Sequence, residues 1–279
     1  MNTICICGAG TMGSGIAQVA AAAGFDTILY DLSEAVLAKA KDKLHKDLET
    51  LVQKQKITFQ KKEEILQQLR FISNINHCIA DVVIEAIVEK AEVKIALFNQ
   101  LAGINSEQTI FATNTSSLSV TAIAKEITAP QRVAGLHFFN PAPVMKLVEI
   151  VKAATTSDEA IIQLVALTKR LGKEPVVCKD APGFIVNRVA RPYYIESLRL
   201  AEEGVANFET IDRLLESKGF KLGPFKLMDL IGNDVNYAVS CSVYEQLNKP
   251  ERLRPSYIQK EKVEKNELGK KTKKGYYDY

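Results

Sequence analysis

Short apolar runs alternate with amphipathic stretches along the first 180 residues. Apolar runs at residues 3–7 and 27–30 flank a helical stretch of small residues that ends at Gly24, a residue typical of a helix C-cap. A long polar helix is expected after Ser33, which can act as an N-cap. The same patterns predict further strands at 82–84, 110–112, 133–136, 146–151 and 176–178, and helices at 90–101, 120–126 and 157–171. This alternation predicts an α/β domain with a mainly parallel sheet that helices cover on both faces.

The pattern changes after Lys179. An Asp-Ala-Pro-Gly break at 180–183 is followed by helical periodicity without a convincing strand, including an amphipathic stretch at 185–205 that Pro192 could kink. We therefore predict two domains, an α/β domain at residues 1–182 and an all-helical domain at residues 183–279. The lysine-rich tail from 260 to 274 is followed by Gly-Tyr-Tyr-Asp-Tyr, and these aromatic residues predict a docked rather than a mobile end.

Composition narrows the class of protein. The 279 residues are 47% hydrophobic and 25% charged, an ordinary globular balance for a chain with more than one core. The net charge of +3 implies no general attraction to nucleic acid. No run of about 18 apolar residues is present, so no membrane partner is expected. The first expected strand begins at Thr3 instead of following a basic and apolar leader, which favours a soluble, cytoplasmic protein without a signal or transit peptide.

The five cysteines include no Cys-x-x-Cys pair. Cys5 and Cys7 lie two residues apart in the first expected strand, and we expect their side chains on opposite faces of it. The neighbouring sequence offers no further metal ligands. We therefore interpret the cysteines as small buried apolar residues in a reducing compartment, and predict no metal site.

A glycine-rich turn follows the first expected strand. Residues 8–13, Gly-Ala-Gly-Thr-Met-Gly, fit the pattern G-x-G-x-x-G between a strand and a helix, where the backbone and the helix N-terminus can hold a pyrophosphate. Asp31 ends the second strand, where a carboxylate accepts hydrogen bonds from ribose hydroxyls and repels a 2′-phosphate. The alternative is a packed turn with a helix-capping aspartate. The glycines, the preceding strand, the following helix and the acid, however, all fit the dinucleotide-binding pattern. The sequence thus predicts a Rossmann-type, doubly wound domain that binds NAD through Gly8, Ala9, Gly10, Thr11, Met12, Gly13 and Asp31.

Of the three histidines, His137 has the context of a catalytic group. His45 lies in a lysine-rich helix and His77 in a polar stretch, both typical of surface residues. His137 follows the apolar run 133–136, and ligands of open α/β sheets bind at the carboxyl ends of strands. Glu149 lies between apolar neighbours in a later strand and needs a partner there. Pairing with Glu149 would orient the imidazole and stabilise its charged form, which suits a general base.

Taken together, the motifs resemble the L-3-hydroxyacyl-CoA dehydrogenase family over essentially the whole chain, in the family's order and spacing. They are the glycine turn with Asp31, Glu-Ala-Ile-Val-Glu at 85–89, Asn-Thr-Ser-Ser-Leu at 114–118, His-Phe-Phe-Asn-Pro at 137–141, Met-Lys-Leu-Val-Glu at 145–149 and Pro-Gly-Phe-Ile-Val-Asn-Arg at 182–188. The later motifs are far more specific than the glycine turn. The length of the chain is similar to that of the short bacterial members, which act on 3-hydroxybutyryl-CoA.

The resemblance implies roles for the matching residues. His137 would be the catalytic base with Glu149 as its partner, and the substrate would contact two further catalytic residues, Ser116 and Asn187. The cofactor site would be completed by Glu89, Lys94, Asn114, Ser116 and Lys271. Further substrate contacts would come from Asn140 and, for coenzyme A, from the basic hairpin within 39–62 through Lys54 and Lys56. For any single lysine, a solvated helix face explains the charge equally well.

The activity implied by the resemblance is reversible oxidation of (S)-3-hydroxyacyl-CoA to 3-oxoacyl-CoA with NAD, as in fatty acid metabolism, with short chains preferred. A homodimer through the helical domain is also implied, and its helices are too few to bury their apolar faces alone. A dehydrogenase of a small hydroxy acid or sugar acid without coenzyme A remains an alternative, as does an inactive nucleotide-binding protein. Three departures from the family pattern, which bear on chain length or dimer packing, are Lys226, Asn233 and Lys273.

Overall fold

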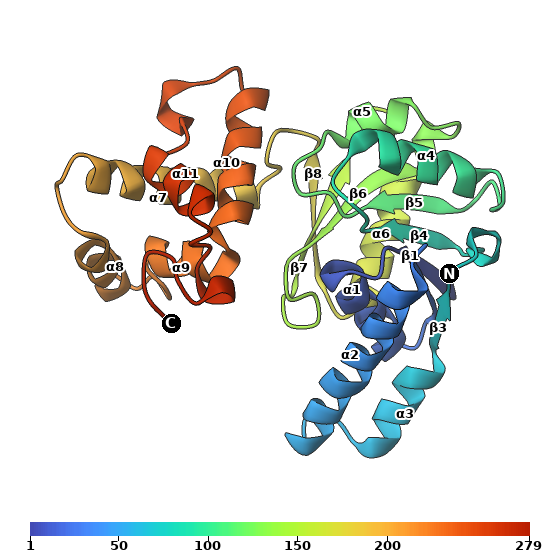
Figure 1. Ribbon diagram of the computed structural model, residues 1–279. Coiled ribbons are helices and arrows are strands. Elements are labelled where there is room, and N and C mark those ends of the chain that lie inside the picture. Colours follow the sequence, from blue (N-terminus) through green and yellow to red (C-terminus); the bar gives the residue numbers. More distant parts are fainter. The chain divides into compact units, whose positions relative to one another are not determined.

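The computed structural model describes residues 1–279, which form two compact units, Met1–Asp180 and Ala181–Tyr279 (Figure 1). The boundary between the units lies in the Asp-Ala-Pro-Gly break. None of the helices combines the length and the apolar character that crossing a membrane requires.

The first unit is built on one eight-stranded sheet with the order β3-β2-β1-β4-β5-β6-β7-β8. Neighbouring strands are parallel except for the pair β6 and β7, which is antiparallel. Parallel neighbours need crossover connections, and most of these contain a helix. The strands are β1 (Thr3–Cys7), β2 (Asp26–Tyr30), β3 (Leu69–Ile72), β4 (Val82–Glu85), β5 (Ile110–Thr113), β6 (Val133–Phe138), β7 (Leu147–Lys152) and β8 (Glu174–Lys179).

Helices cover both faces of the sheet. Ile4 and Ile6 of β1 belong to the apolar core that includes the buried side of α1. Phe111 of β5 lies on the opposite face and contacts Phe98 of α4, with ring centroids 5.6 Å apart. Ser33 caps α2 by accepting a hydrogen bond from a first-turn amide, as predicted. The helical elements are α1 (Thr11–Ala22), α2 (Glu34–Gln53), α3 (Phe59–Gln67), η1 (Ile75–His77), α4 (Ala91–Ala102), α5 (Val120–Lys125), η2 (Pro130–Arg132) and α6 (Asp158–Arg170).

The second unit is helical, with only isolated β-bridges near its end. Its core includes the rings of Phe208, Phe225 and Tyr276, whose centroids lie 4.6 to 5.0 Å apart. Pro192 lies inside α7, the helix that the amphipathic stretch predicted. The helical elements are α7 (Val186–Glu202), α8 (Phe208–Ser217), α9 (Pro224–Ile231), α10 (Asn233–Gln246), η3 (Glu251–Leu253), α11 (Tyr257–Glu264) and η4 (Lys270–Thr272).

A buried carboxylate docks the end of the chain. Asp229, only 1% exposed, accepts hydrogen bonds from the backbone amides of Tyr276 at 3.0 Å and Tyr277 at 3.1 Å. The Tyr279 hydroxyl and the Asn233 side-chain amide also donate to it, at 3.1 and 2.8 Å. These donors satisfy a charge that would otherwise be costly to bury. The prediction of a docked aromatic end is confirmed.

The predicted strands and helices of the first unit are confirmed, with ends that differ by a few residues, and β3 is an addition to the predicted set. Strand β6 extends to Phe138, so His137 lies inside the strand rather than after it. The prediction that Cys5 and Cys7 point to opposite faces is wrong. Side chains alternate along a strand, so residues two apart share a face, and these two sulfur atoms lie 3.9 Å apart.

Candidate active site

Several predicted site residues of the first unit lie at or just after the carboxyl ends of neighbouring strands β2, β1, β4, β5 and β6. These strands are parallel, so their carboxyl ends meet at one edge of the sheet. Ligands of open α/β sheets bind at this edge, where the strand order reverses direction, which here is between β1 and β4.

In the turn after β1, a side chain would clash with other atoms at Gly8 and at Gly13, but not at Gly10. Gly8 has a φ of +101°, and a Cβ on Gly13 would lie 1.7 Å from the Gly8 carbonyl oxygen. A Cβ on Gly10 would meet no atom within 4 Å, and no side chain caps the N-terminus of α1 at this residue. Open space at an uncapped helix N-terminus fits the pyrophosphate of a dinucleotide, because the first amides and the helix dipole attract an anion.

The Asp31 carboxylate is fixed beside this turn. Its Oδ2 accepts a hydrogen bond from the Ala9 amide at 2.9 Å, and its Oδ1 accepts one from the Ser33 amide at 2.9 Å. The end of β2 therefore presents a negative charge next to the glycine turn, at the position where a ribose would accompany the pyrophosphate.

Alanine at Gly13 and alanine at Gly10 are expected to have different effects. Gly13→Ala forces a methyl group onto the Gly8 carbonyl and should lower the free energy of unfolding by about 1–3 kcal/mol, as overpacking does. Gly10→Ala should change that free energy by less than about 0.5 kcal/mol, the range of an unstrained surface change, but weaken NADH binding at least about tenfold. Urea unfolding and NADH fluorescence titrations measure the two effects. Equal NADH affinity of wild type and Gly10→Ala would contradict the assignment of this space to the cofactor.

His137 and Glu149 form a buried pair, as the sequence predicted. The antiparallel register of β6 and β7 places the two residues directly opposite each other, and their side chains share one face of the sheet. The distance from His137 Nδ1 to Glu149 Oε2 is 2.8 Å, and the exposed fractions of the two residues are 5% and 0%. The ring of Phe139 lies against the imidazole, with centroids 4.5 Å apart. A carboxylate in this position accepts a hydrogen bond from Nδ1–H and fixes the tautomer and the orientation of the ring.

Asn114 ties the ends of β5 and β6 together. Its side-chain oxygen accepts a hydrogen bond from the Phe138 amide at 2.8 Å, next to His137. Beyond it, the Ser116 amide donates to Glu89 at 3.3 Å and the Ser117 hydroxyl donates to Glu89 at 3.1 Å. The segment after β5 is therefore held in place by a carboxylate from the segment after β4.

Glu89 belongs to an ion cluster with Glu85 and Lys94, two residues that are buried. The Lys94 ammonium, 1% exposed, is 2.6 Å from Oε1 of Glu85 and 3.1 Å from Oε2 of Glu89. Glu85 also accepts hydrogen bonds from the Thr113 hydroxyl at 2.8 Å and the Ile87 amide at 2.8 Å. Burial raises the pKa of Glu85, although the ammonium opposes this shift. Burial also acts to raise the pKa of Glu89, but Lys94 and the hydroxyl donors outweigh it and lower that pKa.

Glu85 is a residue of this site region that the sequence predictions omit. It ends β4 within an otherwise apolar run, and this is the same signal that singled out Glu149. The resemblance assigned Lys94 to the cofactor site, whereas in the structure its ammonium contacts the two glutamates. A cofactor contact by Lys94 therefore stays a prediction.

The remaining predicted residues lie as follows. Lys54 and Lys56 are exposed at the turn between α2 and α3, which is the predicted hairpin, and Asn140 is exposed before Pro141. Asn187 lies in the first turn of α7, and Lys271 pairs with Asp234 at 2.5 Å, both in the second unit. Contacts of these residues with substrate or cofactor stay predictions.

Comparison with known proteins identifies the family over both units. Residues 3–181 match the family model described as 3-hydroxyacyl-CoA dehydrogenase, NAD binding domain, and residues 183–279 match the model described as 3-hydroxyacyl-CoA dehydrogenase, C-terminal domain. The chain is 51% identical to 3-hydroxyadipyl-CoA dehydrogenase of Escherichia coli over all of its own length, and spans 59% of the length of that relative. It is 43% identical to the mitochondrial hydroxyacyl-coenzyme A dehydrogenase of Sus scrofa, over 99% of this chain and 90% of the relative.

A solved structure agrees with this result. The (S)-3-hydroxybutyryl-CoA dehydrogenase from Ralstonia eutropha matches with a TM-score of 0.95 and 37% identity, over 100% of this chain and 99% of the other. The predictions of a Rossmann-type first domain, a helical second domain and NAD as cofactor are confirmed. The chain belongs to the 3-hydroxyacyl-CoA dehydrogenase family of NAD-dependent oxidoreductases.

Proposed function

We propose that this chain catalyses the reversible oxidation of (S)-3-hydroxyacyl-CoA to 3-oxoacyl-CoA with NAD, and that it prefers short acyl chains such as 3-hydroxybutyryl-CoA. The observation that carries the proposal is the buried His137–Glu149 pair, which lies at the same sheet edge as the glycine turn and Asp31. The names of the relatives support a coenzyme A thioester as the substrate.

The pair supplies the proton transfer that the reaction needs. A hydrogen bond from Nδ1–H to Glu149 favours the neutral tautomer of His137 in which Nε2 carries no proton, and this is the form that can accept the proton of the C3 hydroxyl. Bound NAD⁺ supplies the nicotinamide carbon that accepts the hydride from C3. The carboxylate stabilises the imidazolium that forms, and in the reverse direction the imidazolium returns its proton to the C3 oxygen. Ser116 and Asn187 are proposed to hold that oxygen, which would orient C3 and stabilise developing charge.

Steady-state oxidation of NADH with acetoacetyl-CoA and with free acetoacetate tests the proposal. We expect kcat/KM to be at least about 100-fold higher for the thioester, since binding energy from the remote coenzyme A part is used at the reacting carbon. Equal turnover of both compounds would remove the thioester from the proposal and favour a hydroxy-acid dehydrogenase. Binding of NADH without turnover of either compound would favour the inactive nucleotide-binding protein.

Asp31→Asn is expected to weaken selection of NAD over NADP. The neutral amide keeps an oxygen for the Ala9 amide but loses the negative charge that repels a 2′-phosphate. NADH affinity should fall by about tenfold or more, as expected when a hydrogen bond to a charged group is lost, while NADPH affinity stays equal or rises. Asp26→Asn is the matched control, because Asp26 begins the same strand and pairs with exposed Arg70. An unchanged ratio of the two dissociation constants in Asp31→Asn would refute the role of this carboxylate.

We further propose a homodimer through the second unit. Large apolar side chains are exposed on this unit, among them Val189 at 72%, Val205 at 65% and Leu214 at 59%. Sedimentation velocity should give twice the mass of one chain, and the dimer should persist at high salt, because an apolar interface is not screened. A species with the mass of a single chain at micromolar concentration would contradict the proposal.

A cytoplasmic location and a coenzyme A contact at the α2–α3 turn complete the proposal. The five cysteines are free thiols, which suits a reducing compartment. The exposed ammonium groups of Lys54 and Lys56 can attract the phosphates of coenzyme A.

A further inference from the structure

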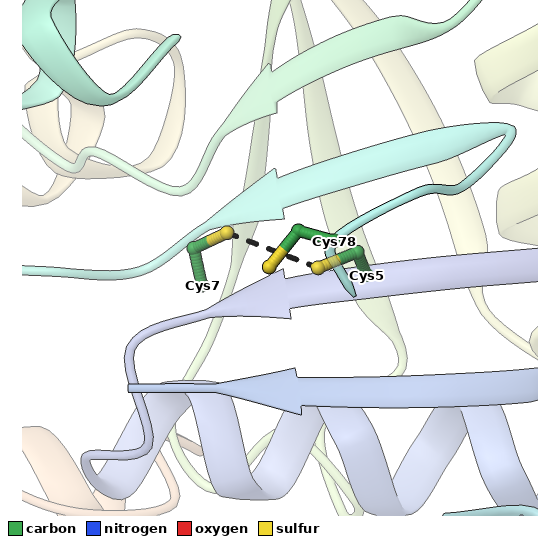
Figure 2. Close-up of side chains that lie close together, drawn as sticks. All are labelled: Cys5, Cys7 and Cys78. Atoms are coloured by element: carbon green, nitrogen blue, oxygen red, sulfur yellow. Dashed lines mark hydrogen bonds between the residues drawn. The ribbon is translucent and has the colours of Figure 1, made fainter. Parts of the chain in front are cut away.

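Three cysteine thiols lie together beside β1, the strand that leads into the glycine turn. Their sulfur atoms, from Cys5, Cys7 and Cys78, all lie within 4.8 Å of one another, and Figure 2 shows them grouped beside β1. All three residues are 0% exposed. We call this group the cysteine cluster.

The backbone fixes the positions of the three thiols. Cys5 and Cys7 share a face of β1, which is hydrogen-bonded to β2 on one side and to β4 on the other. Cys78 follows η1, and its amide donates to the carbonyl of Ile75 at 2.9 Å. The Asn105 side chain holds this segment at two points, donating to the Cys78 carbonyl at 2.8 Å and accepting from the Ala80 amide at 2.9 Å. The cluster is therefore preorganised, because two of its ligands come from a central strand and the third from a segment that Asn105 holds in place.

The spacing of the sulfur atoms matches a three-coordinate metal ion. With metal–sulfur bonds of about 2.3 Å, three sulfurs in a plane around one ion lie about 4.0 Å apart. The distance between the sulfurs of Cys5 and Cys7 is 3.9 Å, and the other distances stay within 4.8 Å. An ion can thus be accommodated with side-chain adjustments of less than about 1 Å, since the cysteine rotamers need only small changes.

From this geometry we propose that the cysteine cluster binds one thiophilic metal ion, Cu(I), with three sulfur ligands. Soft thiolates select such ions over Mg²⁺ and Ca²⁺, which take oxygen ligands. The cluster contains three cysteines and no histidine or carboxylate, whereas structural zinc sites hold four protein ligands. Binding forms three Cu–S bonds, and each thiol that ionises releases one proton to solvent.

The number of thiols favours metal binding over a disulfide. A third thiol has no function in a disulfide between the other two, but it completes a trigonal ligand set.

Titration of the reduced full-length chain with Cu(I) under argon, in competition with the chromogenic chelator bicinchoninate, tests the proposal. We expect one equivalent of Cu(I) to move from the chelator to the protein. We expect at least about tenfold weaker binding in each of the variants Cys5→Val, Cys7→Val and Cys78→Ala. Replacing a residue that only hydrogen-bonds to a metal ligand already costs about this much affinity. Cys178→Ser and Cys241→Ser, which change the two cysteines outside the cluster, are the matched controls and should bind like wild type. Equal affinity in the cluster variants and wild type would overturn the proposal.

A measurement on the unaltered chain keeps the test independent of how well the variants fold. X-ray absorption at the copper edge should show three sulfur neighbours at about 2.3 Å. Nitrogen or oxygen neighbours, two sulfurs only, or no retained equivalent of copper would overturn the proposal.

Discussion

His137→Gln lowers kcat for reduction of acetoacetyl-CoA by about 10²- to 10⁴-fold, the usual contribution of a positioned general acid or base. Glutamine fills a similar volume and can still donate to Glu149, but it cannot exchange a proton with the C3 oxygen near neutral pH. NADH affinity stays close to wild type, because the glycine turn and Asp31 lie on other strands. Stopped-flow and steady-state assays give kcat, and fluorescence titration gives the NADH dissociation constant.

Glu149→Gln is the matched control on the other member of the pair. The amide oxygen can still accept a hydrogen bond from Nδ1–H but no longer stabilises an imidazolium, so we expect a smaller loss of kcat than in His137→Gln. The double variant should be no worse than about His137→Gln alone, because residues that act as a unit are not additive. Unchanged kcat in His137→Gln would remove the histidine from the mechanism, whatever the substrate.

Lys94→Met destabilises the first unit by about 3–5 kcal/mol, which is the cost of removing one partner of a buried ion pair and leaving the other charge in place. Methionine matches the length and apolar stem of lysine but leaves the buried carboxylate of Glu85 without its cation. Urea unfolding followed by circular dichroism measures the loss. A variant as stable as wild type would show that the ion cluster of Lys94, Glu85 and Glu89 contributes nothing to the free energy of unfolding.

The loss in Lys94→Met depends on pH in a defined direction. Burial already raises the pKa of Glu85 in the folded chain, and removing the opposing ammonium raises it further. The folded state then binds a proton that the unfolded state has released, so stability falls as pH rises from the unfolded pKa through the raised folded pKa. The deficit should be smaller at pH 5 than at pH 8. Lys94→Met combined with Glu85→Gln should recover part of the loss at pH 8, since no buried charge is left on Glu85.

Periodicity predicted most of the first unit, because its central strands are apolar on both faces and end at glycine or polar residues. It did not predict β3. That strand has four residues, lies at the sheet edge and buries only Leu69, so it carries too little apolar signal. In the second unit, Lys273 takes a φ of +61°, a backbone conformation that glycine adopts at less cost, which explains why glycine is common at this position in the family that the chain resembles.

For the candidate site, the sequence predicted a side-chain contact where one residue carried its own signal. Glu149 was polar within an apolar strand and required a partner, and His137 provided it. Glu85 carries the same signal but lies at the last position of β4, one residue beyond the predicted strand end, so its link to Lys94 was missed. The approach of Cys78 to Cys5 and Cys7 depends on how residues 75–81 fold over β1, and no local pattern encodes that long-range contact.

The docking of the chain end on Asp229 has a consequence for synthesis on the ribosome. The first unit can assemble as soon as it emerges, because its sheet uses no residue beyond Lys179. Asp229 is made midway through the second unit, yet two of its hydrogen-bond donors are the amides of Tyr276 and Tyr277 near the end of that unit. Until that segment has left the exit tunnel, the nascent helices α7 to α10 cannot close around this carboxylate, so the second unit completes its fold only after its last turn has emerged.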